Sequence, residues 1–150
     1  MEPPLTPLMR LTPMDVVGPV IGGVVFILLM SLIREPTRRN LNAILVAGSA
    51  GLYISGGFGP WELLYAAIAV PVAYRGLRSY TFIGVGWLLH ASWDLPHYLF
   101  SRPLWPYLPT SSWGCMLFDS VIAVWFLAGA PTLIWRGNAA AARVERSMSV

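Results

Sequence analysis

Three ionisable side chains share one apolar stretch, GWLLHASWDLPHYLF, which covers residues 86–100. His90 and Asp94 are separated by four positions, and Asp94 and His97 by three. Side chains at these spacings are neighbours on one face of a helix, so imidazole and carboxylate groups are expected to meet there. Such a set can hold a divalent metal ion or pass protons along a row of hydrogen bonds.

Helix geometry limits how these groups can share an ion. His90 and His97 lie on one face but about 10 Å apart along the helix axis, whereas metal–nitrogen bonds are only about 2.0–2.1 Å long. One ion can therefore take two of the three groups, with Asp119 or Glu62 completing the site. Alternatively two ions share Asp94, or the row relays protons without a metal.

The stretch belongs to one of five apolar segments that approach the roughly 20 residues needed to span a bilayer. The composition agrees with lipid as the solvent, because 56% of residues are hydrophobic and only 11% are charged, against about 25% in a typical soluble domain. We therefore predict an all-α integral membrane bundle over residues 14–135, with spans at about 16–33, 41–59, 61–74, 80–100 and 113–135.

Arginine positions predict the orientation of the bundle. If all five segments span, two arginines fall on one side and eight on the other: Arg10 and Arg102, against Arg34, Arg38, Arg39, Arg75, Arg78, Arg136, Arg143 and Arg146. The positive-inside rule then predicts an outside N-terminus and a cytoplasmic C-terminus. A re-entrant third segment would place Arg75 and Arg78 on the wrong side, which favours five spans.

The ends of the chain carry no catalytic pattern. Residues 1–13 are Pro-rich and predict a disordered arm, and residues 136–150 predict a cytoplasmic tail. The run after the arm lacks a strongly positive start and a small-residue cleavage site, so we interpret it as a retained membrane helix. Met14 is an alternative start of the chain.

The positions of the basic residues argue against nucleic-acid binding, and the cysteine count excludes a disulfide or a CxxC site. The arginines flank apolar segments and form no single stripe, so a nucleic-acid partner is not expected. One cysteine, Cys115, allows no intramolecular disulfide and no CxxC motif.

Small side chains recur every fourth residue in the second segment, which places them in one row on a helix. The row consists of Ala43, Ala47, Gly51, Ser55 and Gly59. Such rows let helix backbones approach closely in lipid. The row therefore predicts either packing inside one bundle or the face of a homo-oligomer.

Asp94 and Asp119 are expected at matching depth in consecutive antiparallel helices, about 9 and 10 Å below their outer ends. An unpaired charge at depth costs at least about 2.5–3.5 kcal/mol, which favours a functional polar site there. The predicted metal ligands are His90, Asp94, His97 and Asp119, the predicted catalytic carboxylates are Glu62 and Asp94, and the supporting residues are Trp93, Tyr98 and Cys115.

The site suggests three functions. Zinc suits a mixed His/Asp set, and a zinc-bound water can hydrolyse an ester or amide in a lipophilic substrate, with Glu62 as base. The alternatives are a proton-coupled carrier of a small solute, which predicts an oligomer, and a non-catalytic accessory membrane subunit. Clustering of the polar groups in the outer half favours the metal site.

Three stretches resemble one family: RNLNAILVAGSAGLYISGGFGPWELLYA, YRGLRSYTFIGVGWLLHASWDLPHYL and PTSSWGCMLFDSVIAVWFLAGAP. They are similar to small bacterial integral membrane proteins that share domain of unknown function 6010, over roughly residues 14–131. The resemblance implies a multi-pass protein of the bacterial cytoplasmic membrane, and it supplies no information about activity. The family pattern has a His pair where this chain has His97 and Tyr98.

Overall fold

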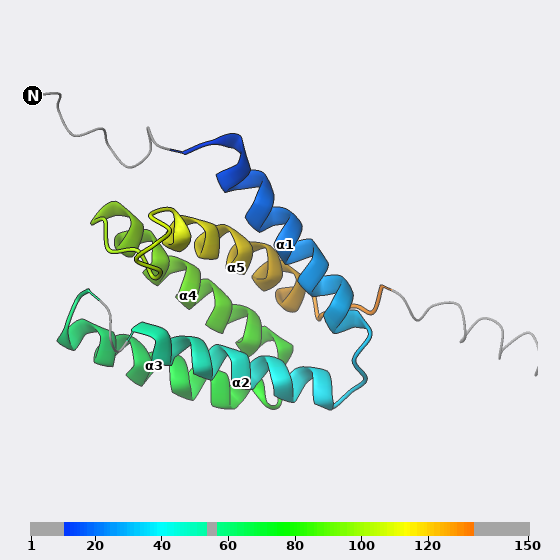
Figure 1. Cartoon of the computed structure of the whole chain (residues 1–150). Helices are drawn as coiled ribbons and strands as arrows, with labels where there is room; N and C mark the ends of the chain where they lie inside the picture. The colour runs from blue at the N-terminus through cyan, green and yellow to red at the C-terminus, as the bar shows by residue number, and fades with distance from the viewer. Residues whose placement is uncertain (1–10, 54–56, 134–150) are drawn as a thin grey trace, which may run out of the picture.

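The computed structural model describes residues 11–53 and 57–133, and these residues form five helices with no strand between them. The helices are α1 (Pro13–Ser31), α2 (Thr37–Leu52), α3 (Pro60–Gly76), α4 (Tyr80–Leu99) and α5 (Ser111–Leu127), as Figure 1 shows. The predicted all-α fold is confirmed. The predicted arm and tail fall largely or wholly outside the described residues.

Local signals explain where several helices begin and end. The backbone N–H and the hydroxyl of Thr12 both donate to the Asp15 carboxylate, at 2.8 and 2.6 Å, which caps the start of α1. α5 stops at Leu127, short of the predicted residue 135, because Gly129 adopts a left-handed φ of 86° and Pro131 cannot continue a helix. Pro71 lies inside α3 and does not end it.

The small-residue row of the second segment is not continuous. α2 ends at Leu52, whereas the predicted span ran to residue 59. Gly59 instead precedes α3 with a left-handed φ of 58°, and Ser55 lies outside the described residues. Ala43 is buried in the core, while a Cβ at Gly51 would meet nothing within 4 Å. The helical part of the row therefore includes one residue packed inside the bundle and one facing outward.

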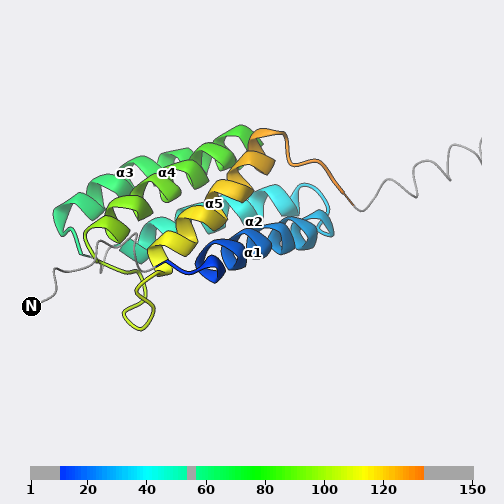
Figure 2. The same ribbon diagram turned by 90° about the horizontal axis from the view of Figure 1, so that it is seen from above.

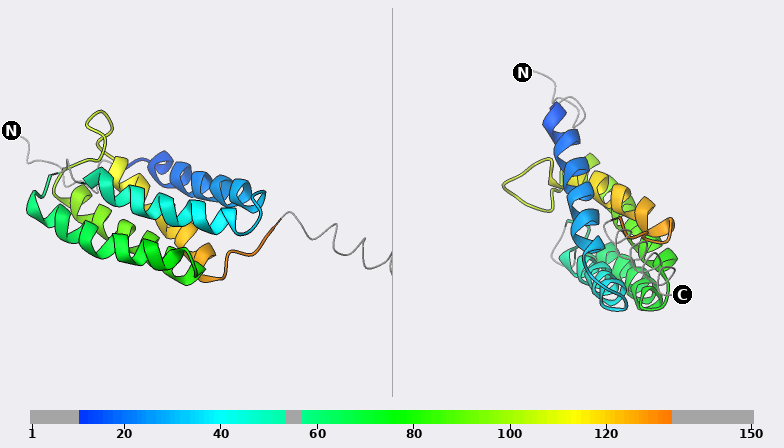
Figure 3. Two further views of the ribbon diagram at one scale, coloured as in Figure 1. Left: turned by 90° about the horizontal axis from the view of Figure 1, so that it is seen from below. Right: turned by 90° about the vertical axis from the view of Figure 1, so that its right-hand side faces the viewer.

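α4 is the central helix, since it packs against α2, α3 and α5, and α1 lies at the edge of the bundle against α5 (Figures 2 and 3). Glycines bring its neighbours close. A Cβ at Gly86 would lie 2.5 Å from Val46 on α2, and one at Gly84 would lie 2.7 Å from Leu127 on α5. α4 can therefore present side chains to three other helices at once.

Among the described helices, α1 alone is both long and apolar enough to cross a membrane, and only 11% of its apolar window is buried. α5 is apolar but shorter. α4 has 20 residues but carries polar side chains, among them His90, Asp94 and His97. These features support association with a membrane.

Candidate functional site

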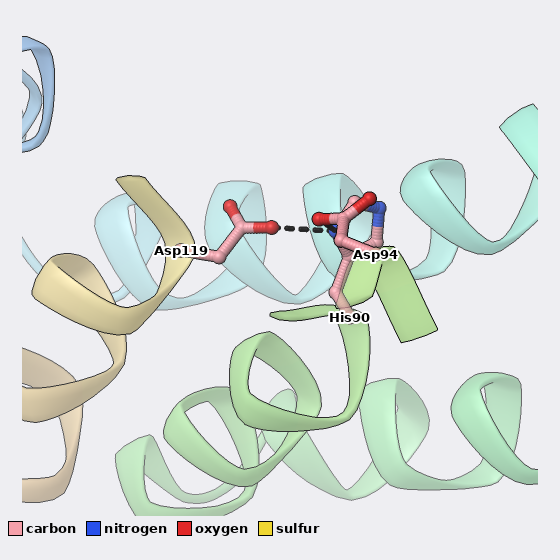
Figure 4. Close-up of side chains that lie close together, drawn as sticks. All are labelled: His90, Asp94 and Asp119. Atoms are coloured by element: carbon pink, nitrogen blue, oxygen red, sulfur yellow. Dashed lines mark hydrogen bonds and ion pairs between the residues drawn. The ribbon is translucent and has the colours of Figure 1, made fainter. Parts of the chain in front are cut away.

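A histidine and two aspartates meet at the interface of α4 and α5 (Figure 4). His90 and Asp94 project from consecutive turns of α4, and Asp119 reaches them from α5. The Nδ1 atom of His90 lies 2.5 Å from Oδ2 of Asp119 and 3.3 Å from Oδ2 of Asp94. All three residues are buried: His90 is 3% exposed, Asp94 0% and Asp119 3%. We call these three residues the His–Asp cluster.

The cluster can hold a proton or a cation between its members. The Nδ1–H of His90 donates to Asp119, because a carboxylate oxygen only accepts. Two carboxylates in one buried site repel each other unless a positive charge compensates them. One ligand atom from each of the three residues lies within 4.8 Å of the other two, which suits a single small ion.

Tyr53 adds a fourth residue that the sequence analysis missed. Its hydroxyl donates to Oδ1 of Asp94 at 2.5 Å, and its side chain is fully buried. Its ring centroid lies 5.0 Å from that of His90 and 4.9 Å from that of His97. Tyr53 is the one tyrosine in the predicted span 41–59. Its partner Asp94 can be identified only from the packing of α2 against α4.

Replacing Tyr53 with Phe is expected to destabilise the protein by about 1–3 kcal/mol, because Asp94 loses a buried hydrogen-bond donor. The free energy of unfolding in detergent measures this effect. Tyr98→Phe is the matched control, since within the described residues the buried Tyr98 hydroxyl has no hydrogen-bond partner. Equal effects of the two changes would contradict a role for the Tyr53 hydroxyl.

A second buried pair lies beside the cluster. Nε2 of His97 is 3.2 Å from Oε1 of Glu62, and the two residues are 1% and 0% exposed. Glu62 also accepts hydrogen bonds from the Trp93 indole N–H at 2.8 Å and the Phe58 backbone N–H at 3.1 Å. The structure thus pairs His97 with Glu62 on α3, not with His90. We call this the His97–Glu62 pair.

The remaining predicted residues take supporting positions. Trp93 stacks on Tyr65 at 5.2 Å while it holds Glu62. The ring of Tyr98 packs on Trp113, with centroids 5.3 Å apart. Cys115 lines an apolar cavity of about 490 Å³ between the starts of α1 and α5. Cys115 and Asp119 are four positions apart on α5, so their side chains are neighbours on one face of that helix.

Comparison with known proteins assigns a family and no activity. Residues 14–132 match the model of a family of unknown function, DUF6010. No curated protein and no solved structure matches the chain. The matched range covers α2 to α5, all of α1 except its first residue, and every residue of the His–Asp cluster. The chain therefore belongs to the DUF6010 family of unknown function.

Proposed function

We propose that the five helices form an integral membrane bundle of the bacterial cytoplasmic membrane, with the N-terminus outside. The surface supports this, because large apolar side chains are exposed on every helix; examples are Val24 at 47%, Ile44 at 63%, Leu63 at 60%, Leu88 at 42% and Val124 at 66%. Exposed apolar area of this extent is unusual on a soluble monomer. α3 and α5 have 17 residues each, the lower limit of the range of about 17–25 for spanning helices, and α2 has 16, just below it.

Exposed aromatic side chains also support a membrane bundle. Trp61 is 62% exposed, Trp105 is 68% and Tyr107 is 95%, and all three belong to the end where α3 begins and α4 ends. Tyr74, at the opposite end of α3, is 66% exposed. Aromatic rings with a polar edge favour the two membrane interfaces. The lipid bilayer is therefore the first partner we assign.

Within this bundle, we propose that the His–Asp cluster binds one divalent metal ion. The observation that carries the proposal is the convergence of one imidazole and two carboxylates from α4 and α5 in a site at most 3% exposed. Two carboxylates balance the charge of a divalent cation. Zinc fits best, because it accepts mixed nitrogen and oxygen ligands and leaves a fourth position open. The His90–Asp119 contact must open by about 1 Å to admit the ion, since tetrahedral ligand atoms lie roughly 3.4 Å apart.

Such an ion supports a hydrolase acting on a lipophilic substrate. A zinc-bound water is acidified toward neutral pH and can attack an ester or amide. The apolar cavity lined by Cys115 is the approach we assign to the substrate. Glu62, which the sequence predicted as the base, contacts His97 instead. We therefore assign Glu62 no step in this reaction, and Asp94 is the one predicted catalytic carboxylate that lies in the cluster.

Metal content tests the proposal directly. Protein purified in detergent without chelator is expected to contain about one zinc ion per chain by mass spectrometry. Removing the ion should lower the melting temperature, and reloading should restore it, because a ligand present at 100 times its Kd stabilises by about 2.7 kcal/mol. A metal-free protein that also fails to take up zinc, manganese or iron(II) would contradict the proposal.

A proton relay is the second candidate, and a specific contact favours it. Tyr53 donates to Asp94 and His90 contacts Asp119, each at 2.5 Å, and Nδ1 of His90 lies 3.3 Å from Oδ2 of Asp94. Two hydrogen bonds and one ion-pair contact therefore link four groups in a row without any ion. This arrangement suits a proton-coupled carrier or a non-catalytic subunit. A carrier further predicts a homo-oligomer, for which the open surface at Gly51 is the candidate contact.

A further inference from the structure

A second cavity, of about 500 Å³, lies where α2 ends and α4 turns back toward α5. It contains neither aspartate of the His–Asp cluster, and it is separate from the apolar cavity at Cys115. Its walls are formed by Leu52, Gly57, His97, Arg102, Pro103, Leu104 and Pro106. Arg102 and His97 are the wall residues whose side chains can carry charge, and no acidic residue of the described part of the chain lines the cavity.

Two hydrogen bonds to His97 hold the backbone of Arg102. The N–H of Arg102 donates to the His97 carbonyl at 2.8 Å. The Nδ1–H of His97 donates back to the Arg102 carbonyl at 3.0 Å, because a carbonyl only accepts. Ser101 completes the turn with a left-handed φ of 54°. His97 is itself held by Glu62, so the position of Arg102 depends on the buried His97–Glu62 pair.

The aliphatic part of the Arg102 side chain lies directly against Gly57. A Cβ added at Gly57 would lie 2.4 Å from Cδ of Arg102 and 3.0 Å from its Cγ. Any larger residue would therefore force the arginine side chain to move. Glycine at this position lets the Arg102 side chain pass along the cavity wall.

The guanidinium of Arg102 has no partner among the residues that the structure describes. Within residues 11–53 and 57–133, the Arg102 side chain makes no hydrogen bond and no ion pair, and the residue is exposed. A guanidinium offers a planar pair of N–H donors that matches the two oxygens of a carboxylate or a phosphate. Anchoring the backbone and the aliphatic stem lowers the entropy lost when those donors bind.

We propose that this cavity binds an oxyanion, a carboxylate or a phosphate, through the Arg102 guanidinium. Leu52, Leu104 and the two prolines contact the apolar part of the ligand. A lipid headgroup and a water-soluble anion share this chemistry. The site is independent of the metal proposal, because it contains none of the three cluster residues.

Calorimetric titration of the full chain in a non-ionic detergent tests the site. The probes are inorganic phosphate, short-chain phosphatidylglycerol and short-chain phosphatidylcholine. Saturable binding of phosphate or phosphatidylglycerol, or both, supports the site and identifies the source of the anion. Failure of both to bind, or equal binding of the zwitterionic phosphatidylcholine, would overturn the proposal.

Two pairs of variants make the test specific to Arg102. Arg102→Gln is expected to weaken anion binding at least tenfold, while Arg78→Gln, an exposed arginine at the opposite end of the bundle, leaves it unchanged. Gly57→Ala should weaken binding without changing any charge, while Gly51→Ala, where a Cβ meets nothing, should not. Equal losses within either pair would overturn the assignment. Zinc content should be unchanged in all four variants, which separates failure of this site from failure of the metal site.

Discussion

Asp119→Asn is expected to abolish metal binding while leaving the five-helix fold intact. The change is nearly isosteric, but an amide is a poor ligand for zinc and removes one of the two charges that balance the ion. Residues that hydrogen-bond to the ligands of a metal typically contribute 10–100-fold to metal affinity. Loss of a residue that binds the metal directly should therefore lower the affinity at least about 100-fold. Asp94→Asn should have the same effect, because α4 and α5 build one site.

Metal content by mass spectrometry and affinity by competition with a chelator measure this loss. Asp15→Asn is the matched control, since Asp15 caps α1 through Thr12, accepts a hydrogen bond from Thr110 and contributes nothing to the cluster. The control should retain one ion per chain. If Asp119→Asn keeps its zinc while Asp94→Asn loses it, the ion does not bridge α4 and α5 and the proposed site is wrong.

Glu62→Ala is expected to destabilise the protein by about 3–5 kcal/mol, the usual cost of removing one partner of a buried charged pair. The change leaves the Trp93 indole N–H and the Phe58 backbone N–H without their acceptor, and it removes the ion-pair contact to Nε2 of the buried His97. Unfolding in detergent, followed by tryptophan fluorescence, measures the loss. Zinc content should stay the same, because Glu62 lies outside the cluster.

The control for this change is Glu35→Ala. Glu35 pairs with Arg38 at 3.0 Å and accepts from the Tyr80 hydroxyl, but its side chain is 42% exposed. Solvent screens such a pair, so its removal should cost about 1 kcal/mol or less. A Glu62→Ala variant as stable as Glu35→Ala would show that the His97–Glu62 pair is not a charged interaction.

Much of the architecture follows from patterns along the chain. Apolar runs of near-spanning length predict five helices, and Pro or Gly residues mark most of their ends. The spacing of His90 and Asp94 places them on consecutive turns of α4. The antiparallel order of α4 and α5 places Asp119 at the depth of Asp94, and the structure brings the two into one cluster.

Other contacts depend on how the helices pack around one another. Spacing fixes the face and the axial position of a side chain on its own helix, but not which neighbouring helix meets that face. His97 shares a face with His90, yet it meets Glu62 from α3 about two turns further along. Tyr53 and Arg102 join the sites from the ends of α2 and α4, where no helical periodicity applies. Composition and spacing therefore account for the helices and for the His90–Asp94 face, whereas the packing of five helices assigns each ionisable group its partner.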